Sequence, residues 1–264
     1  MATSLLMGLA DKGFAVERLR ASDPSEERRK LLAAAGINVF ESNAEAISGA
    51  DVILIAVKPQ VVQAVVRELA EVVREQQLVI SIAAGVPISA LQLWVGKAVG
   101  IIRCMPNTPA LKGAGMTGMY QNDLVTDGQS KLGESILSAA GEILWLESEA
   151  QLDAVTAISG SGPAYYFYLT EALISAGQEL GLSAATSEFL ARQTAHGASV
   201  MLRESSETAS TLRVQVTSPG GTTEAALNSL QEHGVADAIN RAVKAAANRS
   251  AELGASLSGP TSDN

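Results

Sequence analysis

Cysteine, histidine and aromatic residues are all scarce in this sequence of 264 residues. Cys104 is the sole cysteine, which excludes a disulfide framework and favours a reducing compartment. The chain has two histidines, at 196 and 233, and their spacing from each other and from Cys104 matches no zinc-ligand pattern. We therefore expect no metal site. No apolar run is long enough to cross a bilayer, and the first residues lack the basic segment of a signal peptide. The expected location is therefore the cytoplasm.

Positive charge is also in short supply. The 19 lysines and arginines are outnumbered by 28 aspartates and glutamates, and the net charge is −9. Nucleic acids and anionic membranes bind clustered cations, so we expect neither as a partner. Apolar residues make up 47% of the chain, which is enough to form a core. The length of 264 residues is enough for one large domain or two moderate ones.

Apolar, strand-like runs alternate with helical patterns through the first half of the chain. The run D-V-I-L-I-A-V at 51–57 is continuously apolar, which is typical of a strand buried on both faces of a parallel sheet. This alternation predicts βαβ units and a parallel, doubly wound α/β sheet. The expected strands are residues 16–21, 37–40, 51–57, 78–82, 99–104, 115–120 and 143–146, and the expected helices are residues 2–12, 24–36, 59–75, 89–95 and 128–140.

The second of these helices carries a clear start signal. Asp23 is the expected N-cap, Pro24 fits the first helical position, and Glu26 completes a capping box.

Strand-like runs stop near residue 149. Six helical patterns follow, at residues 152–158, 163–180, 184–204, 207–216, 222–231 and 235–253. We expect an α/β domain over residues 1–148 and an all-α domain over 149–264, whose helices, rich in alanine and glycine, serve a subunit interface. The tail at 256–264 is expected to be disordered.

A dinucleotide-binding fold begins with a strand and a G-x-G-x-x-G/A turn before its first helix. This sequence begins instead with the helical pattern M-A-T-S-L-L-M-G-L. We expect that the natural first strand and its glycine-rich turn are missing from the sequence as given, as a start assigned at an internal methionine would explain. The alternative is a complete chain with an ordinary surface helix at its start.

The stretch T-S-P-G-G-T-T-E at 217–224 places two glycines and several hydroxyls where a helix begins. Exposed main-chain amides at such a point form an anion-binding nest, for which a small carboxylate is a natural ligand. The alternative is a plain helix start, with Ser or Thr as N-cap and Glu224 in the first turn.

Four blocks together resemble a known family. They are A-V-K-P-Q at 56–60, R-C-M-P-N-T-P at 103–109, S-G-S-G-P-A-Y at 159–165 and T-S-P-G-G-T-T at 217–223. Their order and spacing resemble pyrroline-5-carboxylate reductase. The resemblance implies a Rossmann domain followed by a helical dimerisation domain, and a homodimer that can assemble further into a pentamer of dimers. It implies reduction of 1-pyrroline-5-carboxylate to L-proline by hydride transfer from NAD(P)H.

The resemblance also assigns substrate residues. Thr223 is the catalytic candidate, whose hydroxyl would meet the ring nitrogen. Glu149 would face the substrate near that nitrogen, although an acid favoured by a helix start is a serious alternative. The carboxylate-binding candidates beside them are Ser218, Gly220, Gly221 and Thr222.

Cofactor candidates follow the expected strands, where ligands of doubly wound sheets bind. They are Ser22, Asp23, Pro24 and Asn43 on the adenosine side, Ala56, Val57, Lys58 and Pro59 after the next strand, and Ile82, Ala83, Ala84, Met105, Pro106 and Asn107 towards the nicotinamide. Each has an ordinary alternative, such as a solvent lysine at 58, strand-end packing of the alanines, a turn at Asn107 or an N-cap at Asn43.

Residues near the end of the strand at 16–21 give opposite indications of whether the cofactor is NAD(H) or NADP(H). Asp23 at the end of a strand favours NAD(H), whereas Arg28 or Arg29 could hold the 2′-phosphate of NADP(H). We expect NADP(H) because the family more often uses it.

Two rival functions remain open. A β-hydroxyacid dehydrogenase would need a lysine on the helix opened by S-G-S-G-P-A-Y, and none occurs through Gly181. A non-catalytic oligomer is the other rival. The two histidines are expected to be structural, Cys104 to be a small buried residue, and the aromatic run at 165–168 to lie in the core or in a subunit interface.

Overall fold

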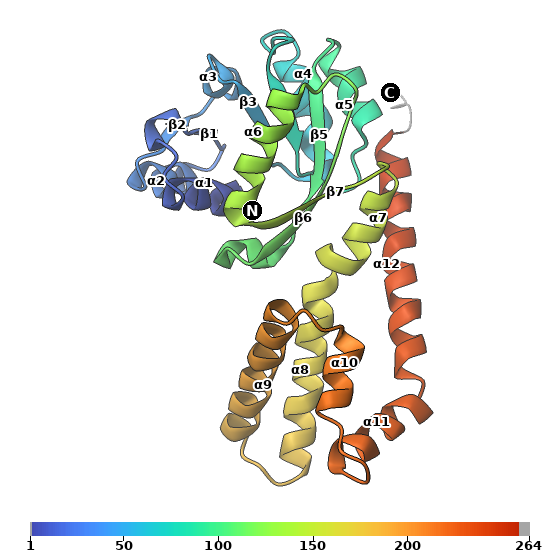
Figure 1. Cartoon of the computed structure of the whole chain (residues 1–264). Helices are drawn as coiled ribbons and strands as arrows, with labels where there is room; N and C mark the ends of the chain where they lie inside the picture. Colours follow the sequence, from blue (N-terminus) through green and yellow to red (C-terminus); the bar gives the residue numbers. More distant parts are fainter. Residues whose placement is uncertain (1, 259–264) are drawn as a thin grey trace. The chain divides into compact units, whose positions relative to one another are not determined.

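The computed structural model describes residues 2–258, so most of the tail expected to be disordered lies outside the described residues. The chain divides into two compact units (Figure 1). The first comprises residues 2–161 together with 246–258, and the second comprises residues 162–245. Among the described residues, no helix is long and apolar enough to cross a membrane.

The first unit is built around a five-stranded sheet with the order β3-β4-β5-β6-β7. Strands β3 (Val52–Ile55), β4 (Leu78–Ser81) and β5 (Gly100–Met105) are parallel, and β7 (Gly141–Trp145) is parallel to β6 (Gly115–Gln121). The expectation of a wholly parallel sheet is wrong at β6, which runs antiparallel to β5. Only nine residues separate the two strands, and a parallel crossover needs about a dozen or more.

Helices cover both faces of this sheet, as expected for a doubly wound fold. One face packs on α4 (Pro59–Leu69) and α5 (Ile88–Val95) through core residues that include Ile55, Val66, Leu91 and Ile101. The other face packs on α1 (Ala2–Asp11) and α6 (Asp127–Leu137) through Leu5, Ile80, Ile102, Cys104 and Leu137. Neighbouring residues of β4 and β5 thus point to opposite cores, which explains their unbroken apolar sequence.

Cys104 is 2% exposed within the second of these cores. Burial raises the pKa of its thiol, so the group stays protonated and unreactive in the folded protein. The expectation of a small buried residue is confirmed.

Two short strands, β1 (Arg20–Ser22) and β2 (Asn38–Phe40), form a separate parallel pair. The strand expected at 16–21 is wrong in its first half, because Val16–Arg18 forms the 3₁₀ turn η1. Helix α3 (Asn43–Ile47) follows β2 and contacts both strands of the pair and α4.

The start of α2 (Glu26–Ala34) also differs from the expectation. Ser25 is the N-cap, and its hydroxyl accepts from the amide of Arg28 at 3.4 Å. Asp23 instead accepts from the amide of Ser25 at 2.8 Å, so it forms a turn before the helix. Pro24 therefore lies outside the helix, and Glu26 begins it rather than completing a capping box.

Helix α4 ends at Leu69, six residues earlier than the expected end at 75. The side chain of Gln77 accounts for the turn that follows. Its oxygen accepts from the amide of Arg74 at 2.8 Å, and its nitrogen donates to the carbonyl of Ala50 at 2.7 Å. These bonds compete with continuation of the helix.

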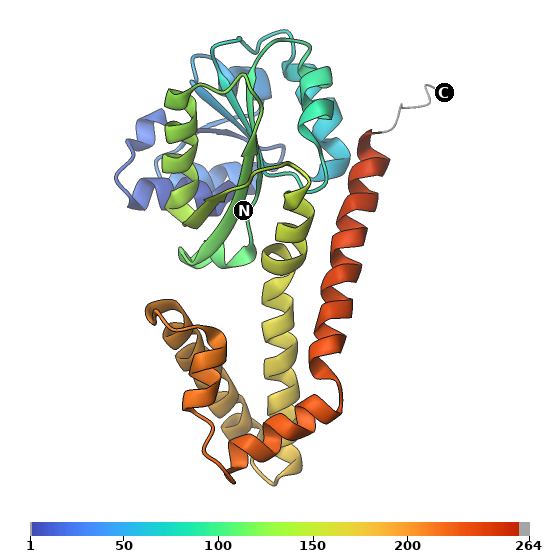
Figure 2. The same cartoon turned by 45° about the vertical axis from the view of Figure 1, so that its right-hand side comes forward.

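The first unit also contains η2 (Thr108–Lys112), η3 (Ser138–Ala140), α7 (Gln151–Val155) and the π-turn η4 (Thr156–Gly160). The second unit contains α8 (Gly162–Glu179), α9 (Ala184–Glu204), α10 (Ala209–Gln215), α11 (Thr222–Glu232) and the start of α12 (Val235–Ser258). Helices α8 and α9 lie side by side in both views (Figures 1 and 2). Helix α12 begins in the second unit and ends in the first.

The aromatic run on α8 is not part of the core. Tyr166, Phe167 and Tyr168 are 64–75% exposed. A core position is therefore wrong for these three residues, and their position in a subunit interface stays a prediction.

Candidate functional site

The segments after β3, β4 and β5 lie at one edge of the sheet, because the three strands are parallel. After β3, Lys58 is exposed at the N-cap position of α4, and nothing between residues 2 and 258 pairs with its ammonium group. After β4, Ala83 is buried and Ala84 is partly buried, so small side chains form this loop. The other cofactor candidates in these two segments are Ala56, Val57 and Pro59 after β3, and Ile82 after β4. A free cation and small residues at one sheet edge fit the phosphates and flat ring of a dinucleotide.

Asn107 joins two motifs that lie 52 residues apart in the sequence. Its amide donates to the carbonyl and hydroxyl oxygens of Ser159 at 3.1 and 3.2 Å, and its oxygen accepts from the amide of Met116 at 2.9 Å. A Cβ on Gly160 would lie 2.7 Å from the terminal carbon of Met105, so this methionine packs directly on the glycine. Pro106, which follows Met105, is buried. Asn107 therefore fixes the end of β5 by bonds within the protein.

Ser22 and Asn43 meet at the end of β1. The Ser22 hydroxyl donates to Asn43 Oδ1 at 2.7 Å, and the Asn43 amide donates to Glu68 of α4 at 3.2 Å. The alternative of Asn43 as a helix cap is wrong, because Ser42 caps α3. The two candidates on the adenosine side are thus brought together.

Asp23 and Pro24 follow directly and are held by two arginines of different exposure. Arg29 is 15% exposed and donates to the carbonyls of Asp23 and Pro24 at 2.8 and 3.1 Å, while also pairing with Glu41 at 2.5 Å. Arg28 is 73% exposed and pairs with Asp23 at 3.4 Å. Arg29 makes all of its bonds within this part of the fold, whereas Arg28 is exposed and has one long contact with Asp23, so an anion can reach it.

Glu149 is held inside the first unit. Its Oε1 accepts from the amide of Ile88 and from Nη1 of Arg103, both at 2.8 Å. The side chain of Arg103 is 11% exposed and that of Glu149 is 26% exposed. Glu149 thus satisfies a first-turn amide of α5 and neutralises an arginine in the middle of the sheet.

In the second unit, the stretch 217–224 joins α10 to α11. The amide of Gly221 donates to the carbonyl of Ser218 at 3.0 Å, and Gly220 has a φ of +71°, a conformation that favours glycine. Gly221 is the N-cap of α11, and no side chain caps this helix. The alternative of a Ser or Thr cap is therefore wrong. The hydroxyls of Thr222 and Thr223 make no hydrogen bond to any described residue.

A carboxylate is already bound at this turn. The amide of Gly220 donates to Oε2 of Glu224 at 2.7 Å. One amide of the predicted nest is thus taken by a carboxylate from the first turn of its own helix, and substrate binding at this turn stays a prediction.

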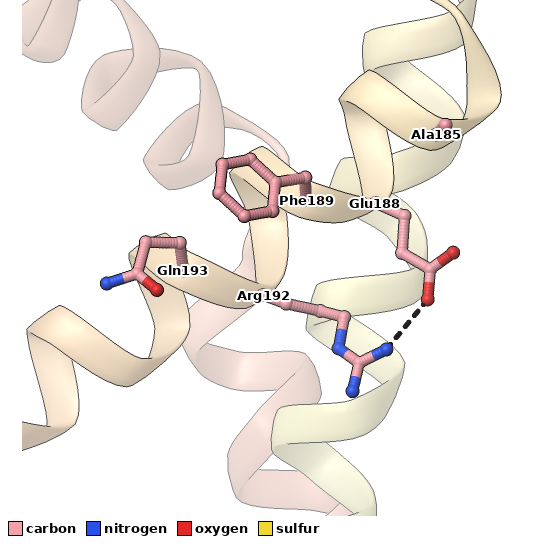
Figure 3. A pocket seen from close by; sticks show the side chains of 5 residues that line it. All are labelled: Ala185, Glu188, Phe189, Arg192 and Gln193. Atoms are coloured by element: carbon pink, nitrogen blue, oxygen red, sulfur yellow. Dashed lines mark hydrogen bonds and ion pairs between the residues drawn. The ribbon is translucent and has the colours of Figure 1, made fainter.

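The candidate residues therefore form two groups. The cofactor candidates and Glu149 lie in the first unit, and the loop from Ser218 to Thr223 lies in the second. A shallow hollow of about 390 Å³ opens elsewhere, on one face of α9 (Figure 3). Its lining residues are Ala185, Glu188, Phe189, Arg192 and Gln193, none of which is a predicted site residue. Within the described chain, no group of three or more His, Cys, Asp or Glu side chains could hold a metal ion.

Comparison with known proteins identifies the family. Residues 1–85 match the family model described as "NADP oxidoreductase coenzyme F420-dependent", and residues 149–253 match "Pyrroline-5-carboxylate reductase dimerisation". The pyrroline-5-carboxylate reductase of Pseudomonas aeruginosa is 48% identical over 97% of this chain and 94% of its own length. The chain belongs to the pyrroline-5-carboxylate reductase family.

Two solved structures of pyrroline-5-carboxylate reductases show how far the likeness extends. The Coxiella burnetii enzyme matches with a TM-score of 0.92 and 39% identity, covering 96% of this chain and 94% of its own. The Plasmodium falciparum enzyme, with NADP bound, matches with a TM-score of 0.84 and 33% identity over 96% and 94% of the two chains. The predicted Rossmann-type sheet followed by a helical dimerisation domain is thereby confirmed.

Sequence reasoning missed three residues of this pyrroline-5-carboxylate reductase family member. Arg103 stands in one of the four blocks without a role of its own, yet it is the ion-pair partner of Glu149. Ser159 orients Asn107, and Glu224 reaches the Gly220 amide rather than serving only as a helix-start acid. An arginine in an otherwise apolar strand was the one available signal, because buried charges need partners.

Proposed function

We propose that this chain is an NADPH-dependent pyrroline-5-carboxylate reductase, which reduces 1-pyrroline-5-carboxylate to L-proline in the last step of proline biosynthesis. The observation that carries the proposal is the 48% identity to the Pseudomonas aeruginosa enzyme over nearly the whole of both chains. The P. falciparum relative with bound NADP supports the choice of cofactor. NADH is the second cofactor that we propose.

The residues support a mechanism based on positioning. NADPH supplies a hydride to the imine carbon when it is bound. A cyclic imine carries a proton near neutral pH, so the protein mainly has to orient the substrate and exclude water. The amides of the loop at 218–222 hold the substrate carboxylate. The Thr223 hydroxyl, which has no hydrogen-bond partner among residues 2–258, hydrogen-bonds at the ring nitrogen. Lys58, Ser22 and the segments 82–84 and 105–107 hold the cofactor.

The domain roles follow from this assignment. We assign NADP binding to the segment 1–148 and dimerisation with substrate binding to the segment 149–264. The compact units divide later, at residue 161, and residues 246–258 pack with the first unit. The match to a dimerisation family and the exposed aromatic run on α8 support a homodimer built through the helical domain. A pentamer of such dimers is the larger assembly we propose. With its single buried thiol, the chain suits a reducing cytoplasm.

A spectrophotometric assay tests the function directly. The purified chain should oxidise NADPH in the presence of pyrroline-5-carboxylate and form proline, with a lower catalytic efficiency for NADH. A parallel assay with NADP⁺ and 3-hydroxy acids tests the rival dehydrogenase. A folded, oligomeric protein without reductase activity would instead support the non-catalytic alternative.

Substitution of Thr223 tests the catalytic residue. Thr223→Ala should lower kcat/KM about tenfold, the worth of one good hydrogen bond, while the melting temperature changes little because this hydroxyl has no partner in the described chain. Thr223→Ser keeps the hydroxyl and should retain most of the activity. Equal activity of the alanine and serine variants would remove Thr223 from the mechanism.

A further inference from the structure

The loop between β4 and α5, residues 82–87, touches the last helix of the chain at a glycine pair. Gly85 has a φ of +78° and lies against Leu253 and Gly254 of α12. A Cβ on Gly254 would be 3.0 Å from the carbonyl oxygen of Gly85, and a Cβ on Gly85 would be 3.3 Å from the amide nitrogen of Gly254. The two main chains therefore meet with no room for a side chain between them.

The same loop is held at its other end by the chain that leads to the helical unit. Ile88, the first residue of α5, donates its amide to Glu149, and Glu149 is fixed by Arg103. Ser250 of α12 donates to Asp153 of α7 at 2.7 Å, which anchors the helix one turn before Gly254. All these residues belong to the first unit. The β4–α5 loop is thus clamped between the outgoing and the returning connections.

We propose that Gly254 is a positioning residue for hydride transfer, because the main chain of α12 at this point sets the position of the β4–α5 loop. The inference rests on the proposed function, in which Ala83 and Ala84 of that loop lie beside the nicotinamide. A methyl group at 254 pushes the Gly85 carbonyl by a few tenths of an ångström. Hydride transfer is sensitive to such shifts, since displacements of about 1 Å cost about a hundredfold in rate.

A positioning role and ordinary helix packing differ in what a Gly→Ala change should do. Loss of the positioning role lowers kcat, whereas a change in helix packing alters only the melting temperature. Glycine inside a helix disfavours it, so Gly→Ala in open space raises the melting temperature. Gly128 of α6 offers this matched control, because a Cβ added there would have Thr126 Oγ1 as its nearest neighbour, at 4.0 Å. Ser250→Ala tests the anchor itself, since it weakens the hold on α12 without adding an atom near Gly85.

The experiment compares Gly254→Ala, Gly128→Ala and Ser250→Ala with the unaltered protein. Steady-state kinetics give kcat and both KM values, fluorescence titration gives the NADPH dissociation constant without substrate, and melting curves and size-exclusion chromatography monitor folding. For Gly254→Ala we expect kcat to fall about fivefold to tenfold and NADPH to bind about threefold more weakly. The KM for pyrroline-5-carboxylate should stay within about twofold. Gly128→Ala should alter stability alone. Ser250→Ala should lower kcat in the same direction as Gly254→Ala but by less, because it adds no atom against the Gly85 carbonyl.

Unchanged kinetics and NADPH binding in folded Gly254→Ala would overturn the inference, as would the same kinetic loss in Gly128→Ala. If Gly254→Ala does not fold, hydrogen exchange of the unaltered protein with and without NADPH replaces the kinetic test of the proposal. NADPH should then protect the amides of residues 82–86 and of 250–256 together, and protection of the loop alone would overturn the proposal. Failure of the unaltered protein to reduce pyrroline-5-carboxylate would refute the proposed function instead, and the NADPH titrations would still report on the loop.

Discussion

At the scale of single residues, Glu149 shows how a candidate for substrate binding can be occupied by the fold. Its Oε1 accepts from both Ile88 and Arg103, and these partners lie 61 and 46 residues away in the sequence. A role near the substrate nitrogen remains a prediction. The contacts of the described chain make Glu149 a residue that holds the sheet, α5 and the connection to the helical unit together.

Removal of this carboxylate should be costly. Glu149→Ala leaves the 11% exposed Arg103 without a counter-ion and one α5 amide without an acceptor, so we expect the free energy of unfolding to fall by about 2–4 kcal/mol. Glu26→Ala is the control, because its pair with Lys30 has both side chains over 70% exposed and should contribute about 0.5 kcal/mol or less. Urea denaturation measures both. Equal losses would contradict the assigned role of the Arg103–Glu149 pair.

Substitutions of the two arginines after β1 should have different effects. Arg28 is exposed and shares only one long contact with Asp23, so it is the group we expect to meet the 2′-phosphate of NADPH. Arg28→Ala should raise the KM for NADPH about tenfold and leave the constants for NADH within about twofold. Arg29→Ala should lower stability, because it removes the bonds to the Asp23 and Pro24 carbonyls, and should leave the NADPH/NADH ratio unchanged. A ratio that follows Arg29 instead would reverse the assignment.

At the scale of helices and strands, the start of α11 combines a bare helix end with an acidic residue in its first turn. Gly221 provides no side-chain cap, and Glu224 reaches back to the amide of Gly220. A substrate carboxylate and the Glu224 carboxylate would therefore compete for the same amide. The helix gains some stability from this acid, and substrate binding loses some affinity.

Neutralising that acid tests the competition. Glu224→Gln should lower the KM for pyrroline-5-carboxylate about twofold to fivefold, because a negative charge near the helix start is worth about 0.3–1 kcal/mol. The unfolding free energy should fall by a similar small amount. Glu232→Gln, at the other end of α11, is the control and should leave KM unchanged. A higher KM in Glu224→Gln would mean that Glu224 assists substrate binding rather than competing with it.

The sequence predicted these elements where the signal is local. Apolar runs located β3, β4 and β5, and their burial on two faces followed from the absence of polar alternation. The start of α2 was wrong because Asp23 and Ser25 are both good N-cap residues, and propensity alone does not choose between them. The direction of β6 was missed because hydrophobic patterns carry no information on strand polarity.

The site could be predicted only in part for a related reason. Glycine-rich turns and strand ends are visible locally, so the loop at 217–224 and Lys58 could be singled out. The bonds of Asn107 to Ser159 and of Ser250 to Asp153 span 52 and 97 residues. Such contacts depend on packing that no local pattern encodes. The same applies to Gly85 and Gly254, whose close approach appears only in three dimensions.

At the scale of the whole molecule, the exposed apolar surface of α8 is the feature that a second copy of the chain would cover. Tyr166, Phe167, Tyr168 and Leu169 are 57–75% exposed in the single chain. Side chains of this size are rarely left in water as a cluster. The match of residues 149–253 to a dimerisation family supports the proposal that a second copy covers this surface.

A charge placed on this surface should break the assembly. We expect Phe167→Glu to shift the mass from a multiple of 27.3 kDa towards that of one chain, in a concentration-dependent manner, because a carboxylate cannot be buried unpaired. Leu93→Glu is the control, since Leu93 is 76% exposed on α5 and should not affect assembly. Size-exclusion chromatography with light scattering measures the mass and separates dimers from pentamers of dimers. An unchanged mass for Phe167→Glu would exclude α8 from the interface.

Because Cys104 is buried, its reaction with a thiol reagent reports how often the first unit opens locally. Because the chain has a single thiol, and native packing keeps that thiol covered and protonated, a maleimide can modify only molecules whose β5 has come away from its neighbours. Mass spectrometry of a labelling time course would count those openings without any engineered probe. A nucleotide that closes over the strand ends should slow the modification.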